Sequence, residues 1–221
     1  MSKREALTIL FAPFLINLVA SMAVYFTTPH QLDPSQMVKI LYSKIFSYQS
    51  ALMVIIQLGF GIYLLRYCKG LYDFRLKDLL LSAGLVAFSL VTFTVEHVTS
   101  SLIYGMSYEE YSKWFRDVVS MTPAWARYMN ALIVPFTAGI FEEVIWRGYG
   151  ITKLEEFAST RVAVLVQALA FALWHISPIH VLFVFPIGLA YGYAFVKRRS
   201  LAPLTLAHVV TDLLGMSVWL T

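Results

Sequence analysis

The sequence predicts an all-α protein, a polytopic membrane bundle of about seven helices within a range of six to eight. Of the 221 residues, 59% are apolar and only 14% are charged, whereas a soluble domain carries about 25% charged residues. The mean hydropathy is +0.69. The apolar residues form runs close to the ~20 residues that a helix needs to cross a bilayer. These features exclude a water-soluble domain, a disordered chain and, with Cys68 as the single cysteine, a secreted disulfide scaffold.

Seven such runs follow one another along the chain, and each predicts one membrane helix. They lie near 6–26, 51–67, 79–95, 125–148, 161–177, 179–196 and 203–220. Two further segments, 36–48 and 108–119, are amphipathic at helical spacing, so each is expected to lie on the bilayer surface or to cap the bundle. Because no repeat or linker divides the chain, we expect residues 1–221 to form a single membrane domain.

The basic residues indicate an orientation. When the 17 Lys and Arg residues are assigned to alternating sides of the seven spans, the side of the N-terminus receives twelve and the other side five. The twelve are Lys3, Arg4, Arg66, Lys69, Arg75, Lys77, Arg147, Lys153, Arg161, Lys197, Arg198 and Arg199, and the five are Lys39, Lys44, Lys113, Arg116 and Arg127. The positive-inside rule then predicts a cytoplasmic N-terminus.

These properties also predict where the protein resides and what surrounds it. We expect an integral, multi-pass protein of a prokaryotic cell membrane, with the lipid bilayer as a partner. The formal net charge of +4 is not a signature of nucleic-acid binding, so no nucleic acid is expected.

The charges inside the apolar spans cluster in the segment 140–148, which holds Glu142, Glu143 and Arg147. Each charge costs about 2.5–3.5 kcal/mol at the bilayer centre, so the three must be paired or face a water-filled cavity. Glu143 and Arg147 have the i, i+4 spacing and the order that favour an ion pair. Glu142 points about 100° away around a helix and has no local partner. A purely structural ion-pair network is the alternative.

Two later spans each supply a histidine. His175 comes near the end of one run, and His208 lies early in the last run, four residues before Asp212. The Asp212 carboxylate can accept a hydrogen bond from His208 and fix its tautomer. A glutamate and a histidine on neighbouring helices could share one water molecule, which the carboxylate deprotonates while the imidazole orients it.

A shared water requires that Glu142 and His175 lie at similar depths in the membrane. At 1.5 Å per residue the two depths agree only if the fourth helix continues to about Leu154. We therefore predict that this helix runs past Gly148 and Gly150 and that the site opens toward the cytoplasmic half.

In order along the chain, Glu142-Glu143-x-x-x-Arg147, Phe171-x-x-x-His175 and His208-x-x-x-Asp212 resemble the three motifs of the CPBP family. These are the CAAX-protease and bacteriocin-processing intramembrane endopeptidases, also called Abi or Rce1-like proteins. The resemblance covers about residues 125–215. It implies about eight membrane helices with a conserved four-helix catalytic core, here residues 121–221, after motif-free helices in residues 1–120. It also implies hydrolysis of a peptide bond in a membrane-anchored or lipidated protein or peptide.

The family pattern implies a role for each residue. Glu142 would be the general base that activates water, assisted by His175, and His208 and Asp212 would stabilise the oxyanion. Glu143 and Arg147 would support the site. Asp212 stands where prenyl-protein members usually have Asn, and an ionised Asp offers only acceptors, so Asp212 is expected to orient His208 or to carry a proton.

The cofactor question has two answers at this stage. We expect a glutamic-type mechanism with no cofactor and no bound metal, although one Glu and two His are also a possible zinc set.

Two other classes of function remain open. One is a non-catalytic protein of the same fold that binds a peptide, such as a bacteriocin self-immunity protein. The other is a proton-coupled carrier or haem-binding membrane protein in which His175 and His208 are relay groups or axial ligands. The combination of Glu142 with both histidines favours the endopeptidase, because pure binding does not require a water-activating pair.

Overall fold

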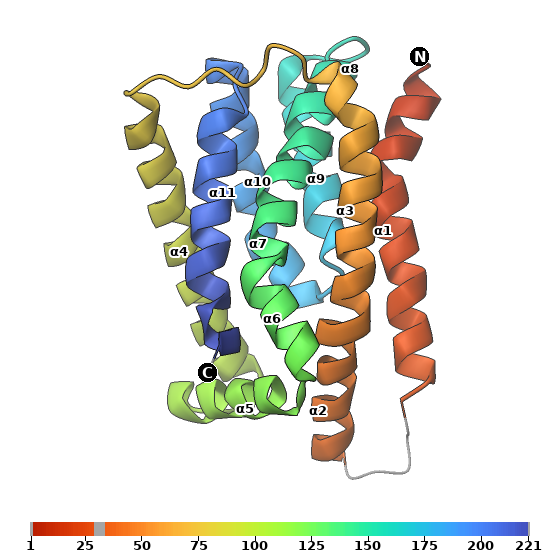
Figure 1. Ribbon diagram of the computed structural model, residues 1–221, viewed down its shortest axis with the longest axis vertical. Helices are drawn as coiled ribbons and strands as arrows, with labels where there is room; N and C mark the ends of the chain where they lie inside the picture. Colours follow the sequence, from red (N-terminus) through yellow and green to blue (C-terminus); the bar gives the residue numbers. More distant parts are fainter. Residues whose placement is uncertain (1, 29–33, 221) are drawn as a thin grey trace.

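The computed structural model describes residues 2–28 and 34–220, and every regular element within them is helical (Figure 1). The elements are α1 Lys3–Phe26, α2 Pro34–Lys44, the π-helix η1 Ile45–Gln49, α3 Ser50–Leu64, the 3-10 helix η2 Leu65–Tyr67, α4 Asp78–Ile103, α5 Tyr108–Met121, α6 Ala124–Leu132, α7 Val134–Thr137, the π-helix η3 Ala138–Ile151, α8 Thr152–Leu154, α9 Thr160–Trp174, α10 Pro178–Arg198, α11 Ala202–Gly215 and the 3-10 helix η4 Met216–Leu220.

Six helical stretches in the described residues are long and apolar enough to cross a membrane. They are Lys3–Phe26, Gln36–Tyr67, Asp78–Ile103, Ala124–Leu154, Pro178–Arg198 and Ala202–Leu220. The expected span 161–177 is the helix α9, which has 15 residues. At 1.5 Å per residue α9 is about 22 Å long, shorter than the ~30 Å hydrocarbon core. The all-α membrane bundle is confirmed, with one of its seven apolar helices too short to cross.

The segment 36–48 does not form a separate helix, so that expectation is wrong. α2, η1 and α3 continue one another as a single 32-residue stretch. The polar residues at the joint are buried and bonded: the Ser47 hydroxyl donates to the Ser43 carbonyl at 2.7 Å, and the Gln49 amide donates to Asn17 Oδ1 at 2.8 Å. Because these polar groups have partners, the helix continues into the bundle without a surface segment.

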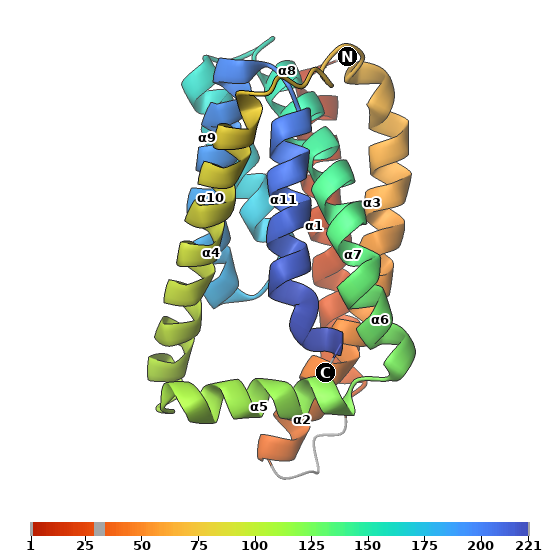
Figure 2. The same ribbon diagram turned by 60° about the vertical axis from the view of Figure 1, so that its left-hand side comes forward.

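The helix α5 lies across one end of the bundle, which we call the α5 end (Figures 1 and 2). Ser107 and Glu110 form a capping box at its start. On its apolar face the ring of Trp114 meets Tyr42 at a centroid distance of 5.3 Å, and Phe115 meets Trp219 at 6.0 Å. Of the two placements expected for the segment 108–119, the structure therefore shows the cap.

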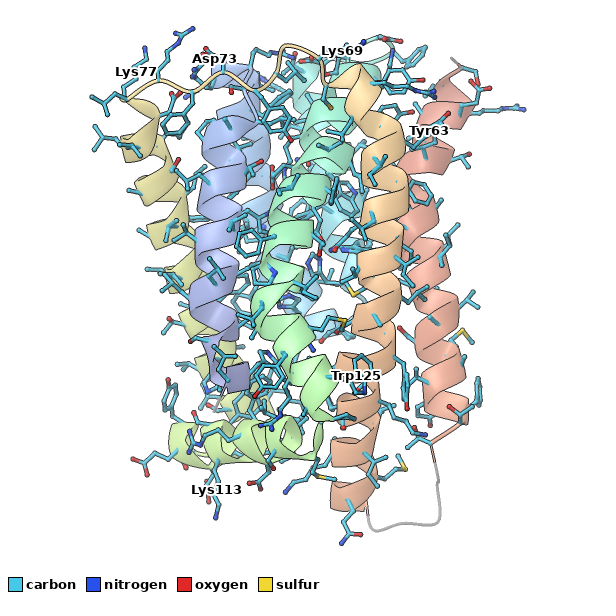
Figure 3. The ribbon with its side chains drawn as sticks, viewed as in Figure 1. Tyr63, Lys69, Asp73, Lys77, Lys113 and Trp125 are labelled. Atoms are coloured by element: carbon cyan, nitrogen blue, oxygen red, sulfur yellow. The ribbon has the colours of Figure 1, made fainter. Side chains whose placement is uncertain are left out.

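The opposite end of the bundle holds the N-terminus (Figure 1) and Lys77 (Figure 3), and we call it the basic end. There Arg199 donates two hydrogen bonds, of 2.7 and 2.8 Å, to the two carboxylate oxygens of Glu155. These bonds hold the pKa of Glu155 below its ordinary value. Lys113 lies at the α5 end (Figure 3), so the two ends can be probed separately.

Cysteine labelling of intact cells should reveal which end faces the cytoplasm. Lys77 and Lys113 are exposed, whereas the native Cys68 is buried and should give little background. With a cytoplasmic N-terminus, a membrane-impermeant maleimide should label Lys113→Cys in intact cells and Lys77→Cys only after permeabilisation. The reverse pattern would overturn the orientation, and the unsubstituted protein is the control.

Small residues allow the helices around the candidate site to approach closely. Gly188 and Gly192 of α10 form a G-x-x-x-G, and Cβ atoms on them would lie 3.1 Å from Ala168 and 2.6 Å from the amide nitrogen of Gln167, so α10 packs against α9 through this face. A Cβ atom on Gly139 of η3 would overlap Val209 of α11. These contacts draw α9, α10, α11 and η3 around one space.

Candidate active site

The residues singled out by the three motifs all line a single cavity of about 380 Å³. They are Glu142, Glu143 and Arg147 of η3, His175 at the end of α9, and His208 and Asp212 of α11. η3 contacts α3, α9 and α11, so side chains from distant parts of the chain meet there. The structure therefore brings together every candidate site residue.

The fourth helix continues as far as the depth argument required. The stretch Ala124–Leu154 passes Gly148 and Gly150 without a break, which confirms that prediction. The motif segment is wound as the π-helix η3 rather than as an α-helix. π-helical turns are rare and occur often at functional sites.

Glu142 is 2% exposed, and its two carboxylate oxygens have different surroundings. Oε1 accepts hydrogen bonds from the Gln57 side-chain amide at 2.7 Å and from the Trp174 indole N–H at 2.9 Å. Oε2 has no hydrogen-bond partner among the described residues and lies 4.0 Å from Nε2 of His208. Two neutral donors thus orient the carboxylate and leave one oxygen free to act on a molecule in the cavity.

Glu143 and Arg147 form the expected i, i+4 ion pair. Arg147 Nη1 lies 3.0 Å from Glu143 Oε1, and both side chains are fully buried. The guanidinium group also lies over the ring of Phe171, 4.1 Å from its centroid, and near Tyr191, 5.3 Å from that ring. The pair is therefore buried among aromatic rings, where removing one partner would leave an uncompensated charge.

His208 is oriented by Glu143 and not by Asp212. Its Nδ1 lies 2.8 Å from Glu143 Oε1, whereas its Nε2 lies 3.6 Å from Asp212 Oδ2, which is too long for a hydrogen bond. The expected bond between His208 and Asp212 therefore does not form. η3 packs closely on α11 at Gly139. This packing brings the Glu143 carboxylate nearer to the His208 ring than the carboxylate of Asp212, although Asp212 lies only four residues further along the same helix.

His175 directly follows the last residue of α9. Its Nδ1 lies 2.9 Å from the carbonyl oxygen of Phe171, and because a carbonyl only accepts, Nδ1 carries the proton and Nε2 is left as an acceptor. The next residue, Ile176, has a φ of 64°, which is rare for a β-branched residue. Such a break in a helix at membrane depth is tolerated where it borders a water-filled cavity.

The end of α9 is secured from another helix. Asn17 of α1 donates its side-chain amide to the carbonyl of Trp174 at 2.7 Å, and Gln49 in turn donates to Asn17 at 2.8 Å. Trp174 bonds Glu142 through its indole and carries His175 as its chain neighbour. This network ties the position of the Glu142 carboxylate to that of the His175 ring.

The cavity is closed toward the basic end and more open toward the α5 end. Arg147, Phe171 and Tyr191, at 0%, 3% and 2% exposure, line its closed part. Phe115 of α5 and Met216 of η4, both half-buried, line its other part. The short α9 carries His175 far from the basic end, and which of the two ends faces the cytoplasm stays a prediction.

Four polar or aromatic residues that line the cavity or bond Glu142 were not identified from the sequence. Gln57 and Trp174 bond Glu142 directly, and the pair Glu96 and His180 lines the same cavity. Gln57 carried a usable signal, since a lone amide in the apolar run 51–67 needs a buried partner. No local pattern links Glu96 to His180, which lie 84 positions apart.

Comparison with known proteins gives one match. No curated protein and no solved structure matches the chain. Residues 123–214, which are 92 of the 221 residues, match the family model described as Type II CAAX prenyl endopeptidase Rce1-like. The match covers all six motif residues and confirms the resemblance that they indicated.

Proposed function

We propose that this protein is an intramembrane endopeptidase in which Glu142 activates the hydrolytic water. The Glu142 carboxylate carries the proposal. Its Oε1 is held by two N–H donors, its Oε2 has no partner among the described residues, and the imidazoles of His175 and His208 line the same cavity. A general base needs this combination of fixed orientation and a free oxygen.

The first chemical step uses Glu142 and His175 together. Oε2 of Glu142 takes a proton from a water molecule as the water oxygen bonds to the carbonyl carbon of the peptide. Nε2 of His175, an acceptor in the tautomer set by Phe171, binds the second hydrogen of that water and orients its lone pair. General acid–base assistance of this kind contributes about 10²–10⁴-fold to a rate.

His208 is the group placed to stabilise the oxyanion that forms. Its Nδ1 is bonded to Glu143, so its Nε2 is the nitrogen near the cavity groups, 4.0 Å from Glu142 and 3.6 Å from Asp212. A proton on Nε2 can be donated to the oxyanion. A donor held in a fixed position stabilises such a charge most strongly where water is excluded.

The substrate class follows from the membrane setting and from the family. A protein or peptide anchored in the bilayer, including a lipidated one, can present its backbone to a cavity formed between membrane helices. The family description names prenylated CAAX proteins, so a farnesylated peptide ending in C-a-a-X is a suitable probe.

The experiment that tests the proposed function compares protein termini in host membranes that carry the wild-type protein or Glu142→Gln. We expect specific new termini to vanish in the variant while a longer precursor accumulates. If no terminus changes although the variant is folded and abundant, the endopeptidase proposal fails and the peptide-binding alternative takes its place.

We also propose that the reaction needs no metal. Gln57 and Trp174 already orient Glu142 through N–H donors, which leaves only Oε2 for catalysis. Dialysis of the purified protein against EDTA, followed by 1,10-phenanthroline, should change kcat for the farnesylated probe by less than about twofold. Loss of activity that zinc restores would show instead that Glu142 and the histidines hold a metal.

A further inference from the structure

A second carboxylate–imidazole pair faces the catalytic cavity and has no role in the steps above. His180 lies in the first turn of α10, and Glu96 lies on α4; both line the cavity. His180 Nδ1 is 2.9 and 3.0 Å from the two oxygens of the Glu96 carboxylate. This bond is the same kind as the one between His208 and Glu143, since in each a carboxylate on one helix binds Nδ1 of a histidine on another.

The ring of His180 is held in a defined orientation beside the water-activating group. It stacks on Phe93 of α4 with a centroid distance of 5.7 Å and an interplanar angle of 18°. Its edge meets the ring of His175 at a centroid distance of 5.0 Å. Since Glu96 fixes Nδ1 and Phe93 fixes the ring plane, the direction of Nε2 is fixed as well.

Nε2 of His180 has no hydrogen-bond or ion-pair partner within the described residues, and the side chain is 32% exposed. The Glu96 carboxylate accepts a hydrogen bond from Nδ1, as the aspartate does for the histidine of a catalytic triad, so Nε2 is the nitrogen through which His180 exchanges protons with the cavity. The proton on Nε2 is then free to leave for an atom in the cavity. His175 cannot supply a proton in this way, because its Nε2 is an acceptor once Nδ1 is bonded to Phe171.

We propose that His180 is the general acid of the reaction and that Glu96 is its positioning residue. The inference rests on the proposed endopeptidase activity. As the tetrahedral intermediate collapses, the C–N bond breaks and its electron pair goes to nitrogen, which takes the Nε2 proton of His180. The carbonyl carbon keeps the oxygen of the attacking water, and Glu142 still holds the proton that it took from that water. Solvent at the open part of the cavity returns a proton to His180 and accepts the one from Glu142.

The experiment compares two substrates that differ only in the leaving group. The purified full chain is given the farnesylated C-a-a-X peptide and its depsipeptide counterpart, in which an ester replaces the amide at the bond that is cut. An alkoxide leaves without prior protonation far more readily than an amide anion. Loss of a general acid should therefore slow amide cleavage much more than ester cleavage.

For His180→Gln we expect kcat/KM for the amide to fall about 100-fold and for the ester to fall less than about tenfold, in keeping with the range for general acid catalysis. The ratio of ester to amide rates should thus rise at least about tenfold. This ratio does not depend on the fraction of folded protein, so a partly unfolded preparation gives the same answer. Glu96→Gln should raise the ratio in the same direction.

His97→Gln is the matched control. His97 is also on α4 and bonds Ser112 at 2.9 Å, but it does not line the cavity. The ratio of ester to amide rates for His97→Gln should therefore equal that of the wild type. An unchanged ratio in His180→Gln would overturn the general-acid role, and Glu96 with His180 would then be a link between α4 and α10. Full cleavage of both substrates by Glu142→Gln would instead overturn the endopeptidase mechanism itself.

Discussion

Glu142→Gln should lower kcat for the farnesylated probe by at least about a thousandfold, within the range that general-base catalysis supplies, and should leave the fold intact. Glutamine has the same shape, and its carbonyl oxygen can still accept the hydrogen bonds that Gln57 and Trp174 donate to Oε1. The amide group then takes the place of Oε2. An amide cannot take a proton from water, so substrate should bind while hydrolysis stops.

The measurement is single-turnover cleavage together with probe binding to the purified variant. Glu156→Gln makes the same chemical change at an exposed carboxylate paired with Lys153, outside the cavity lining, and should keep wild-type activity. If Glu142→Gln cleaves at the wild-type rate, another group is the base. If it loses binding as well as cleavage, Glu142 holds substrate rather than water.

Arg147→Met should lower the free energy of unfolding by about 3–5 kcal/mol, the usual cost of removing one partner of a buried ion pair. Arg147 and Glu143 are fully buried, so the remaining carboxylate would keep only His208 as a close cation, at 2.8 Å. Glu143→Gln should destabilise by a similar amount, because it leaves the guanidinium buried beside Phe171 without an anion.

The double variant Glu143→Gln with Arg147→Met separates the ion pair from general packing damage. Because it removes both charges, we expect it to be less destabilised than the sum of the two single variants. Thermal unfolding in detergent measures all three, and Arg161→Met, at an exposed position, is the control. Single variants as stable as the wild type would show that the buried pair does not stabilise the fold.

Local sequence patterns were enough to predict a contact between site residues that lie close together in the sequence. The i, i+4 spacing of Glu143 and Arg147 predicted their ion pair, and the same spacing applied to Glu142 showed that it must find a partner elsewhere. The spacing failed for His208 and Asp212, because a neighbouring helix offers His208 a closer carboxylate. Local spacing tells which groups can meet, but packing between helices decides which ones do.

The membrane architecture was also predictable in outline, with errors at positions where polar residues interrupt apolar runs. Ser47 and Gln49 continue one long helix because their side chains find buried partners. The helix in the run 161–177 ends early, at Trp174. Asn17 donates a hydrogen bond to the Trp174 carbonyl, and the helix end borders the cavity, so its backbone polar groups are not left unpaired in lipid. Hydropathy reports the average surroundings of a segment and cannot report such individual partners.

By itself the sequence determined that this protein is a helical membrane bundle, that Glu142, Glu143 and Arg147 lie within one of its apolar spans, and which six residues carry the family motifs. These properties depend on hydropathy and on spacings of a few residues, which any fold of the chain must respect. Only the tertiary structure decided the partner of each polar group. Glu142 meets Gln57 across 85 positions, His180 meets Glu96 across 84, and His208 meets Glu143 across 65. Such pairings depend on how the helices pack, because a buried polar group bonds whichever partner the neighbouring helix presents.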